Sequence, residues 1–167
     1  MQRLALFAFG FLLTLPIAIH AHSHKSHVHG EGKLELTIDR NSVVLNLELP
    51  LDAVVGFEHA PGNDKERAAL KAAESVLNDA AALWLTTPAA NCRIRSVSVD
   101  MPGFADGEHA DLAARYEFQC EVPESLQGIE TTIFKHFKGL YRLETQRVGP
   151  AGQGAQRLSP RNALLRW

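Results

Sequence analysis

The sequence predicts an α+β fold, in which an antiparallel sheet of two hairpins and further C-terminal strands carries two amphipathic helices on one face. Three observations lead to this prediction. Apolar and polar residues alternate in two pairs of short segments, apolar residues at helical spacing follow each pair, and two cysteines can meet across the second pair. The order of elements is therefore ββα, ββα, ββ. Because no low-complexity linker interrupts residues 33–167, we expect them to form a single domain.

The first hairpin follows from strict alternation. Apolar residues occupy every second position over residues 33–39, and the same pattern returns over residues 43–49. This alternation is typical of strands that bury one face. Arg40 and Asn41 lie between the two runs, where the turn is needed, and Pro50 ends the second run.

A helix is predicted to begin after Asn63 and to end before Thr87 and Pro88. Asn63 and Glu66 have the spacing of a capping arrangement, and the residue before a proline disfavours helix. Apolar residues that recur at helical spacing would pack on the sheet. They are Leu70, Ala73, Leu77, Ala80 and Trp84.

The second hairpin, residues 92–99 and 113–122, predicts a disulfide. The register that places Cys92 opposite Cys120 also gathers apolar residues on one face and charged residues on the other. Opposed Cα atoms on antiparallel strands lie ~4.5–5.5 Å apart, within reach of a disulfide that would stabilise the fold by roughly 3–4 kcal/mol. The expected pairs are Ile94 with Phe118 and Ser96 with Tyr116 on the cysteine face, and Arg93 with Gln119 and Arg95 with Glu117 on the other.

The remaining sequence predicts a second helix followed by strands. Apolar residues recur at helical spacing over residues 126–137, and Gly139 is suited to end that helix. Residues 140–148 have the pattern of a strand. We expect a glycine-rich turn at residues 149–154 and a last strand within residues 161–167.

Residues 1–21 have the character of a secretory signal peptide. Arg3 supplies the positive start, and the apolar run over residues 4–19 is shorter than the ~20 residues of a membrane-spanning helix. We expect cleavage after Ala21, with Ala18 as the alternative, and an exported chain that does not span a membrane. Without Arg3 the chain keeps 16 of its 17 basic residues against 19 acidic ones, a net charge of −3 that argues against a nucleic-acid partner.

Histidines concentrate directly after the predicted cleavage site, in the His-rich segment 22–32. Five of the eight histidines lie between His20 and His29. A two-residue spacing places side chains on the same side of an extended chain, roughly 7 Å apart along the backbone, so paired imidazoles could converge on one ion. Zinc takes neutral imidazoles and carboxylates in a small shell, and we predict a zinc site here. The candidate ligands are His22, His24, His27 and His29.

Three further candidate ligands lie within the predicted domain. His109 and Asp111 share the two-residue spacing in the acidic loop of the second hairpin, and His59 follows a Gly-Phe-Glu run. The sequence contains no Gly-x-Ser-x-Gly elbow, no His-Glu-x-x-His motif and no phosphate-binding glycine loop. We therefore expect a binding protein and not an enzyme.

Four features occur in a characteristic order: His27-Val28-His29-Gly30, the first hairpin, Gly56-Phe57-Glu58-His59, and the frame from Cys92 to Cys120. In this order they resemble the ZrgA-type family of zinc-regulated periplasmic proteins. The resemblance implies periplasmic zinc binding that assists an ABC-type uptake system, whose components would be partners. It implies as ligands His27, His29, His59, His109 and Asp111. Several relatives carry a long insertion rich in His, Asp and Glu between the cysteines, whereas residues 100–112 are short here, so we expect few sites.

Two other interpretations stay open at this point. Cleavage after Ala21 would make His24 the third residue of the mature chain, where amine, backbone amides and imidazole form a square-planar set that suits Cu(II) or Ni(II). Alternatively, the histidines are incidental and the disulfide-bonded domain is a scaffold for a protein partner. A periplasmic zinc binder is the leading hypothesis.

Overall fold

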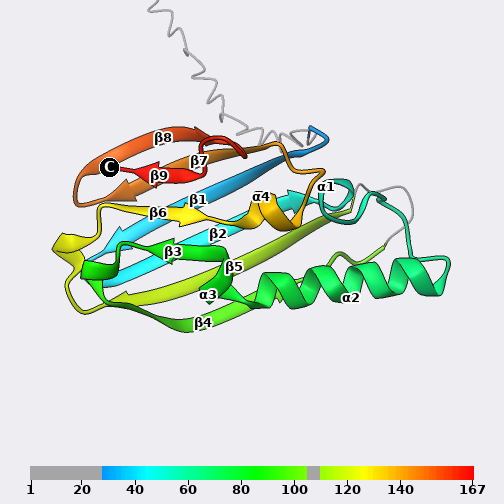
Figure 1. The fold of residues 1–167 in the computed structure, drawn as a ribbon, viewed down its shortest axis with the longest axis horizontal. Coiled ribbons are helices and arrows are strands. Elements are labelled where there is room, and N and C mark those ends of the chain that lie inside the picture. Colours follow the sequence, from blue (N-terminus) through cyan, green and yellow to red (C-terminus); the bar gives the residue numbers. More distant parts are fainter. Residues whose placement is uncertain (1–27, 105–109) are drawn as a thin grey trace, which may run out of the picture.

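The computed structural model describes residues 28–104 and 110–167, which form two β-sheets around a shared hydrophobic core (Figure 1). The larger sheet has the strand order β4-β5-β2-β1-β7-β8, and the smaller sheet has the order β3-β6-β9. The strands of the larger sheet are β1 (Glu31–Asp39), β2 (Ser42–Pro50), β4 (Cys92–Asp100), β5 (Asp111–Cys120), β7 (Arg142–Gly149) and β8 (Gly152–Leu158). Those of the smaller sheet are β3 (Trp84–Thr86), β6 (Gly128–Thr131) and β9 (Leu164–Arg166). The α-helices are α1 (Leu51–Val55), α2 (Asp64–Asn78), α3 (Ala80–Leu83) and α4 (Ile133–His136), and the 3-10 helices are η1 (Pro88–Ala90) and η2 (Pro123–Ser125).

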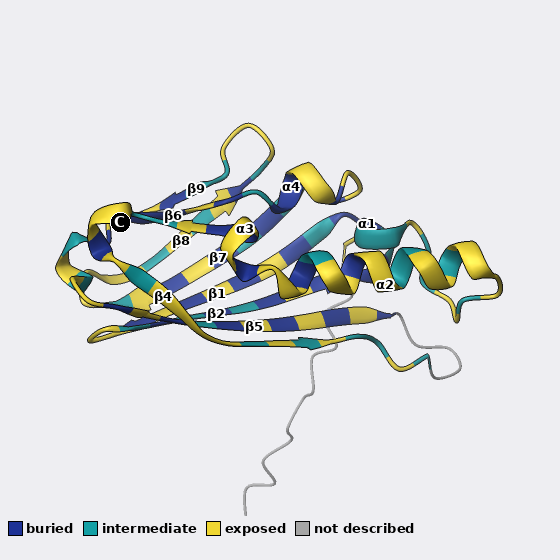
Figure 2. Cartoon of the chain, turned by 60° about the horizontal axis from the view of Figure 1, so that its bottom comes forward, coloured by how far each residue is buried: buried dark blue, intermediate teal, exposed yellow. Residues whose placement is uncertain are grey.

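The predicted α+β class and the first hairpin are confirmed. β1 and β2 pair antiparallel across the turn at Arg40 and Asn41, and buried residues alternate with exposed ones along β1 (Figure 2). The buried face is covered by α2 and the smaller sheet. Trp84 of β3 packs edge-on against Tyr116 of β5, with 5.5 Å between ring centroids, and the Tyr116 hydroxyl donates to the Leu77 carbonyl at 2.9 Å. The core therefore lies between the larger sheet and the elements that cover it.

The first predicted helix starts where expected but ends early. The Asn63 side chain accepts a hydrogen bond from the Glu66 amide at the start of α2. The helix ends at Asn78, since Asp79 leaves helical geometry and its side chain caps the short α3 instead. Trp84 then enters β3 and pairs with Thr131, which buries its indole against the core. The prediction of one helix through Trp84 was therefore wrong, because strand pairing overrides helical spacing there.

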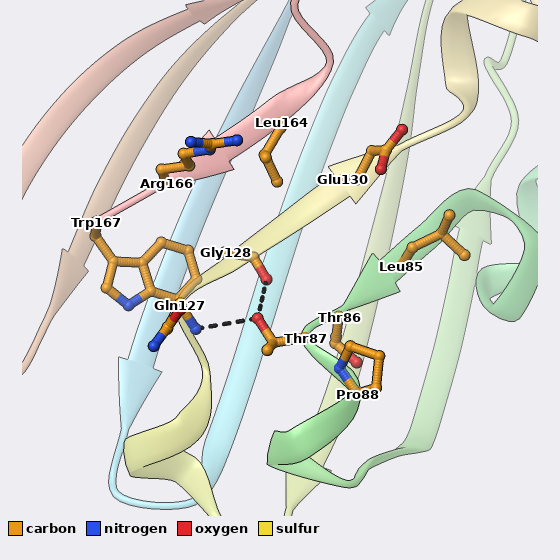
Figure 3. A pocket seen from close by; sticks show the side chains of 10 residues that line it. All are labelled: Leu85, Thr86, Thr87, Pro88, Gln127, Gly128, Glu130, Leu164, Arg166 and Trp167. Carbon is orange, nitrogen blue, oxygen red and sulfur yellow. Dashed lines mark hydrogen bonds between the residues drawn. The ribbon is translucent and has the colours of Figure 1, made fainter.

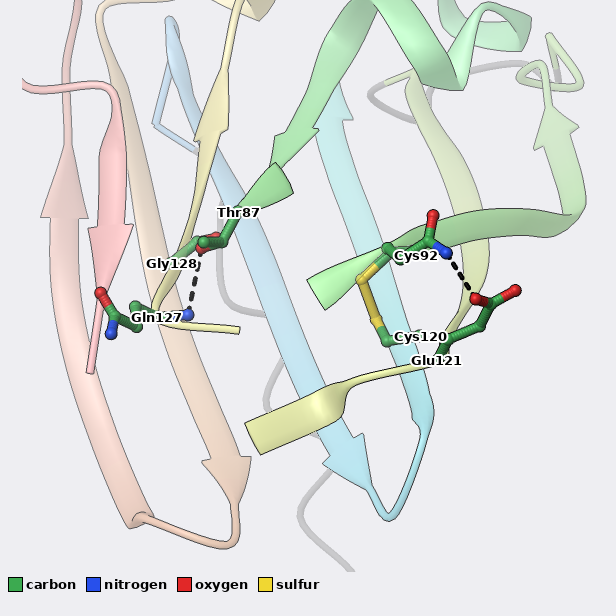
Figure 4. The surroundings of a disulfide bond; sticks show 7 residues. Thr87, Cys92, Cys120, Glu121, Gln127 and Gly128 are labelled. Atoms are coloured by element: carbon green, nitrogen blue, oxygen red, sulfur yellow. Dashed lines mark hydrogen bonds between the residues drawn. A yellow bond between two sulfur atoms is a disulfide. The ribbon is translucent and has the colours of Figure 1, made fainter. Parts of the chain in front are cut away.

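The predicted disulfide between Cys92 and Cys120 is confirmed, and it joins β4 to β5 (Figure 4). The predicted register holds through Ile94 opposite Phe118, and a bulge then inserts Arg95. Beyond the bulge Ser96 faces Glu117 and Val97 faces Tyr116, so the predicted pairs of Ser96 with Tyr116 and Arg95 with Glu117 were wrong. An extra residue in one strand reverses which side chains point inward. It turns the valines of β4 toward the core in place of the serines.

The second predicted helix, residues 126–137, was largely wrong. That segment holds η2, β6 and the four-residue α4. Alternation buries Ile129 and Thr131 on one side of β6, which pairs with both β3 and β9. The strand expected at residues 140–148 is confirmed as β7, which pairs parallel with β1. Residues 152–154, expected in a turn, begin β8.

The side chain of Gln156 joins the two sheets. Its amide nitrogen donates to the Leu164 carbonyl at 2.7 Å, and its amide oxygen accepts from the Arg166 backbone N–H at 3.2 Å. Gln156 lies on β8 and its two partners lie on β9, the edge of the smaller sheet. One side chain therefore takes the place of a neighbouring strand at that edge.

Replacing Gln156 with leucine is expected to lower the free energy of unfolding by about 1–3 kcal/mol, because it leaves a backbone carbonyl and a backbone N–H of β9 without partners. Denaturant unfolding measures the change. Gln153→Leu, on the same strand, is the matched control and should have little effect. Equal stability of the Gln156→Leu and Gln153→Leu proteins would show that the two hydrogen bonds of Gln156 contribute nothing to the free energy of unfolding.

Candidate metal centre

One histidine and two carboxylates converge at the end of the molecule where β1 begins and α1 lies (Figure 1). The residues are His29, Asp52 and Glu58, and one potential ligand atom from each lies within 4.8 Å of the other two. His29 comes two residues before β1, Asp52 is in α1, and Glu58 is in the loop after α1. Three segments that are separate in sequence therefore meet at one point.

The short helix α1 positions the two carboxylates. Leu51 and Ala53 are buried, which leaves Asp52 between them at the partly exposed side. The Leu51 N–H donates to the Ala110 carbonyl at 2.8 Å, so the start of α1 is tied to the segment before β5. Gly56 ends α1 with a φ of 85°, a conformation that glycine adopts without steric cost. The chain turns there, and Glu58 comes back toward Asp52.

The imidazole of His29 lies close to the carboxylates of both Asp52 and Glu58. His29 Nδ1 lies 2.7 Å from Asp52 Oδ2 and 3.7 Å from Glu58 Oε1. An ionised carboxylate only accepts hydrogen bonds, so the Nδ1–H donates to Asp52. The His29 side chain is 68% exposed, while those of Asp52 and Glu58 are 24% and 19% exposed. The acids therefore form the floor of the site and the imidazole forms its solvent side.

The other Asp52 oxygen, Oδ1, is buried and has no hydrogen-bond partner in the described part of the chain. A buried carboxylate oxygen without a donor is costly, and a cation would satisfy it. One nitrogen and two carboxylate oxygens are also a donor set that zinc accepts. The residues present therefore fit a divalent cation of this class.

The hydrogen bond to Asp52 raises the pKa of His29 above its ordinary value of 6.5, and the negative charges of Asp52 and Glu58 raise it further. Because this pKa is raised, the contact stabilises the metal-free fold at low pH, and the contribution is lost as pH rises through the pKa in the folded protein. Metal binding has the opposite dependence, since a proton and a cation compete for Nδ1.

The imidazole resonances of His29 are expected to titrate above pH 6.5 in the metal-free protein, and Asp52→Asn should lower that pKa. An NMR titration of the ring protons in both proteins measures the difference. A His29 pKa that Asp52→Asn leaves unchanged would contradict the contact.

The remaining predicted ligands are placed as follows. His59 is exposed, its Nδ1 contacts the Ala60 carbonyl at 3.0 Å and its ring stacks on Phe57, so it is not one of the three clustered residues. Asp111 starts β5 opposite Pro50 and is also not among the three. The predicted ligands outside the described residues are His22, His24, His27 and His109.

Asp52 and Glu58 were missed by the sequence reasoning. Glu58 lies inside the Gly-Phe-Glu-His run that singled out His59, so that run contained a usable signal. No signal in the sequence marked Asp52 as a ligand, because it is an acid in a five-residue helix without a periodic pattern.

A second surface feature is an open groove of about 780 Å³ over β3, β6 and β9 (Figure 3). Thr87 fixes its floor, since the hydroxyl donates to the Gly128 carbonyl and accepts from the Gln127 N–H. Its lining includes Glu130 and Arg166 but no histidine or cysteine. The groove therefore lacks a set of metal ligands.

Comparison with known families decides how this chain is classified. The family described as ZrgA family zinc uptake protein matches residues 26–167. The chain belongs to the ZrgA family. The match contains the clustered residues and both cysteines, and it confirms the resemblance noted from the sequence. The ZrgA description names zinc uptake and no catalysis. No curated protein gives a significant match to this ZrgA-family chain.

No helix of this ZrgA-family protein within residues 28–104 and 110–167 is long and apolar enough to cross a membrane.

Proposed function

We propose that this protein is exported to the periplasm and binds Zn²⁺ through His29, Asp52 and Glu58 in support of an ABC-type zinc uptake system. The observation that carries the proposal is the convergence of one imidazole and two carboxylates within 4.8 Å, in a chain of a zinc uptake family. The predicted signal peptide at residues 1–21 supports export.

Zinc would replace the proton on His29 Nδ1, the atom that faces both acids. The proton passes to solvent, and the two carboxylates balance the charge of the cation. Three protein ligands leave at least one zinc position for water or a further donor, since zinc is commonly four-coordinate. We propose that His22, His24, His27, His59, His109 and Asp111 serve as additional capture ligands around this centre.

This arrangement favours exchange over storage. The imidazole is 68% exposed, and two of the three ligands are carboxylates, so the ion would remain accessible to an incoming donor. A protein that passes zinc to a transporter needs such access, whereas a structural zinc site is closed by four protein ligands.

A zinc titration of the untagged mature protein tests the proposal. One ion is expected at the centre, and His29→Ala, Asp52→Asn or Glu58→Gln should each weaken its binding by more than about 100-fold, because even the groups that support metal ligands are typically worth roughly 10–100-fold. Glu74→Gln, an exposed acid on α2, is the matched control. Isothermal titration calorimetry and native mass spectrometry give affinity and stoichiometry together.

Bound zinc is also expected to stabilise the fold. At a free concentration about 100 times the dissociation constant, one site raises the free energy of unfolding by about 2.7 kcal/mol. Unchanged zinc affinity in all three ligand variants would overturn the proposed centre. A copper(II) titration of the same proteins discriminates the alternative, since copper held by the mature N-terminus would be insensitive to Asp52→Asn.

A further inference from the structure

The chain on the C-terminal side of His29 is fixed without any metal. Gly30 is buried, and its carbonyl accepts from the Tyr141 N–H at 3.0 Å. Glu31 accepts from the Tyr141 hydroxyl at 3.0 Å and pairs with Arg142 at 2.8 Å. These contacts anchor the start of β1 to the start of β7 and to the residue before it. From Gly30 onward the position of the backbone is thus set by the fold.

The chain on the N-terminal side is held differently. Val28 is 54% exposed, and its carbonyl accepts from the Glu31 N–H at 2.9 Å within a local turn. The side chain of His29 contacts Asp52 across 23 residues of sequence, and this contact links the turn to α1. His29 also lies 3.7 Å from Glu58 Oε1. Contacts made by an exposed charged group contribute little to stability, because water and salt screen them.

We propose that Zn²⁺ bound by His29, Asp52 and Glu58 acts as a clasp that locks the turn at residues 28–31 onto α1 and the loop after it. The inference rests on the zinc site proposed above and goes further, because it couples occupancy of that site to the path of the chain before β1. Coordination would replace one exposed hydrogen bond by three metal–ligand bonds. Two of those bonds come from Asp52 in α1 and Glu58 in the loop after it, which the turn meets through the His29 side chain.

Zinc binding is expected to restrain the chain before β1 and not the strand itself. Gly30 and Glu31 are anchored to β7 and to the residue before it, so Val28 and His29 form the part of the turn that zinc would restrain. The candidate ligands His22, His24 and His27 precede this turn in sequence. Occupancy of the first site would therefore set where that His-rich segment leaves the domain.

The Glu31 amide is the natural reporter, since its N–H closes the turn on the Val28 carbonyl. We would measure hydrogen exchange of the full mature chain by mass spectrometry, with Zn²⁺ alone as the ligand and a chelated sample as reference. Peptides that cover residues 28–32 and 52–59 are expected to exchange about tenfold more slowly with zinc. Peptides from the β4–β5 hairpin should not change.

His29→Ala is the decisive variant, because this side chain is largely exposed and its loss leaves the core intact. The zinc-dependent slowing should disappear in His29→Ala and persist in the control Glu74→Gln. Zinc that binds in an Asp52-dependent manner without slowing exchange at residues 28–32 would overturn the clasp and leave the proposed function standing. Slowing that survives in His29→Ala would also overturn it. A protein that binds no zinc would remove both proposals.

Discussion

Replacing both cysteines with alanine is expected to lower the free energy of unfolding by about 3.5 kcal/mol, which is the chain-entropy value for a loop of this size. Cys92 and Cys120 are 28 residues apart in sequence, and the loop they close contains both strands of the β4–β5 hairpin. For a domain of this size the melting temperature should fall by roughly 10 °C. Alanine is the suitable replacement, since Cys120 is buried and a serine hydroxyl would need a partner.

The same variant separates stability from zinc binding. The disulfide lies near the start of β2, because Cys120 donates its N–H to the Asn41 carbonyl, whereas Asp52 follows the end of β2. A strand of nine residues separates the two places, about 30 Å of extended chain. The zinc affinity of the folded double variant should therefore equal that of the native protein. Thermal unfolding followed by circular dichroism, with the reduced native protein as a second reference, measures the stability change. An unchanged melting temperature would contradict the loop-entropy argument.

The parts of the fold that the sequence predicted are those that depend on local alternation and on one covalent bond. β1 and β2 each bury one side of a strand, so period-two hydrophobicity sets their register. The cysteine pair set the register of β4 and β5 only as far as the bulge at Arg95. The composition of the strand does not reveal that it contains an inserted residue. In the structure, the consequence of the bulge is that Val97 packs against the core.

In the smaller sheet, β9 lies within the last strand expected at residues 161–167, whereas β3 and β6 were not predicted, for a different reason. β3 and β9 have three residues each and β6 has four, so none of them is long enough to express a period. Spacing that suits a helix recurs through Trp84 and Ile129, yet tertiary pairing decides both in favour of strands. The apolar residues of the core could be identified from the sequence, but their distribution among short strands and helices could not.

The residues of the candidate metal centre also differ in how far the sequence predicts them. His29 stands in a His-rich segment and was found by composition, whereas Asp52 and Glu58 become neighbours of His29 only through α1 and the turn at Gly56. That arrangement depends on a helix of five residues and one left-handed glycine. A single sequence is enough to identify the imidazole as a candidate ligand, whereas the two carboxylates are identified only from the fold.

Gly30→Ala is expected to damage both the fold and the metal centre. Gly30 has a φ of 73°, and a Cβ there would lie 2.5 Å from the Tyr141 ring and 2.8 Å from the Gly139 carbonyl oxygen. Left-handed geometry in a residue other than glycine and overpacking each cost about 1–3 kcal/mol, so the free energy of unfolding should fall by about 2–6 kcal/mol. Chemical denaturation measures this change, and Gly103→Ala, where an added Cβ would meet no atom within 4 Å, is the matched control.

The effect on zinc follows from the position of His29 directly before Gly30. Any shift that frees the new methyl group from Gly139 also moves the backbone that aims His29 Nδ1 at Asp52 and Glu58. A metal site tolerates displacements of only about 0.5 Å, so zinc affinity should fall together with stability. Adding Tyr141→Ala would relieve the contact with the ring but not the contact with the backbone oxygen, and affinity should stay low. Native zinc affinity in Gly30→Ala would mean that the approach of β1 to Gly139 does not aim the imidazole.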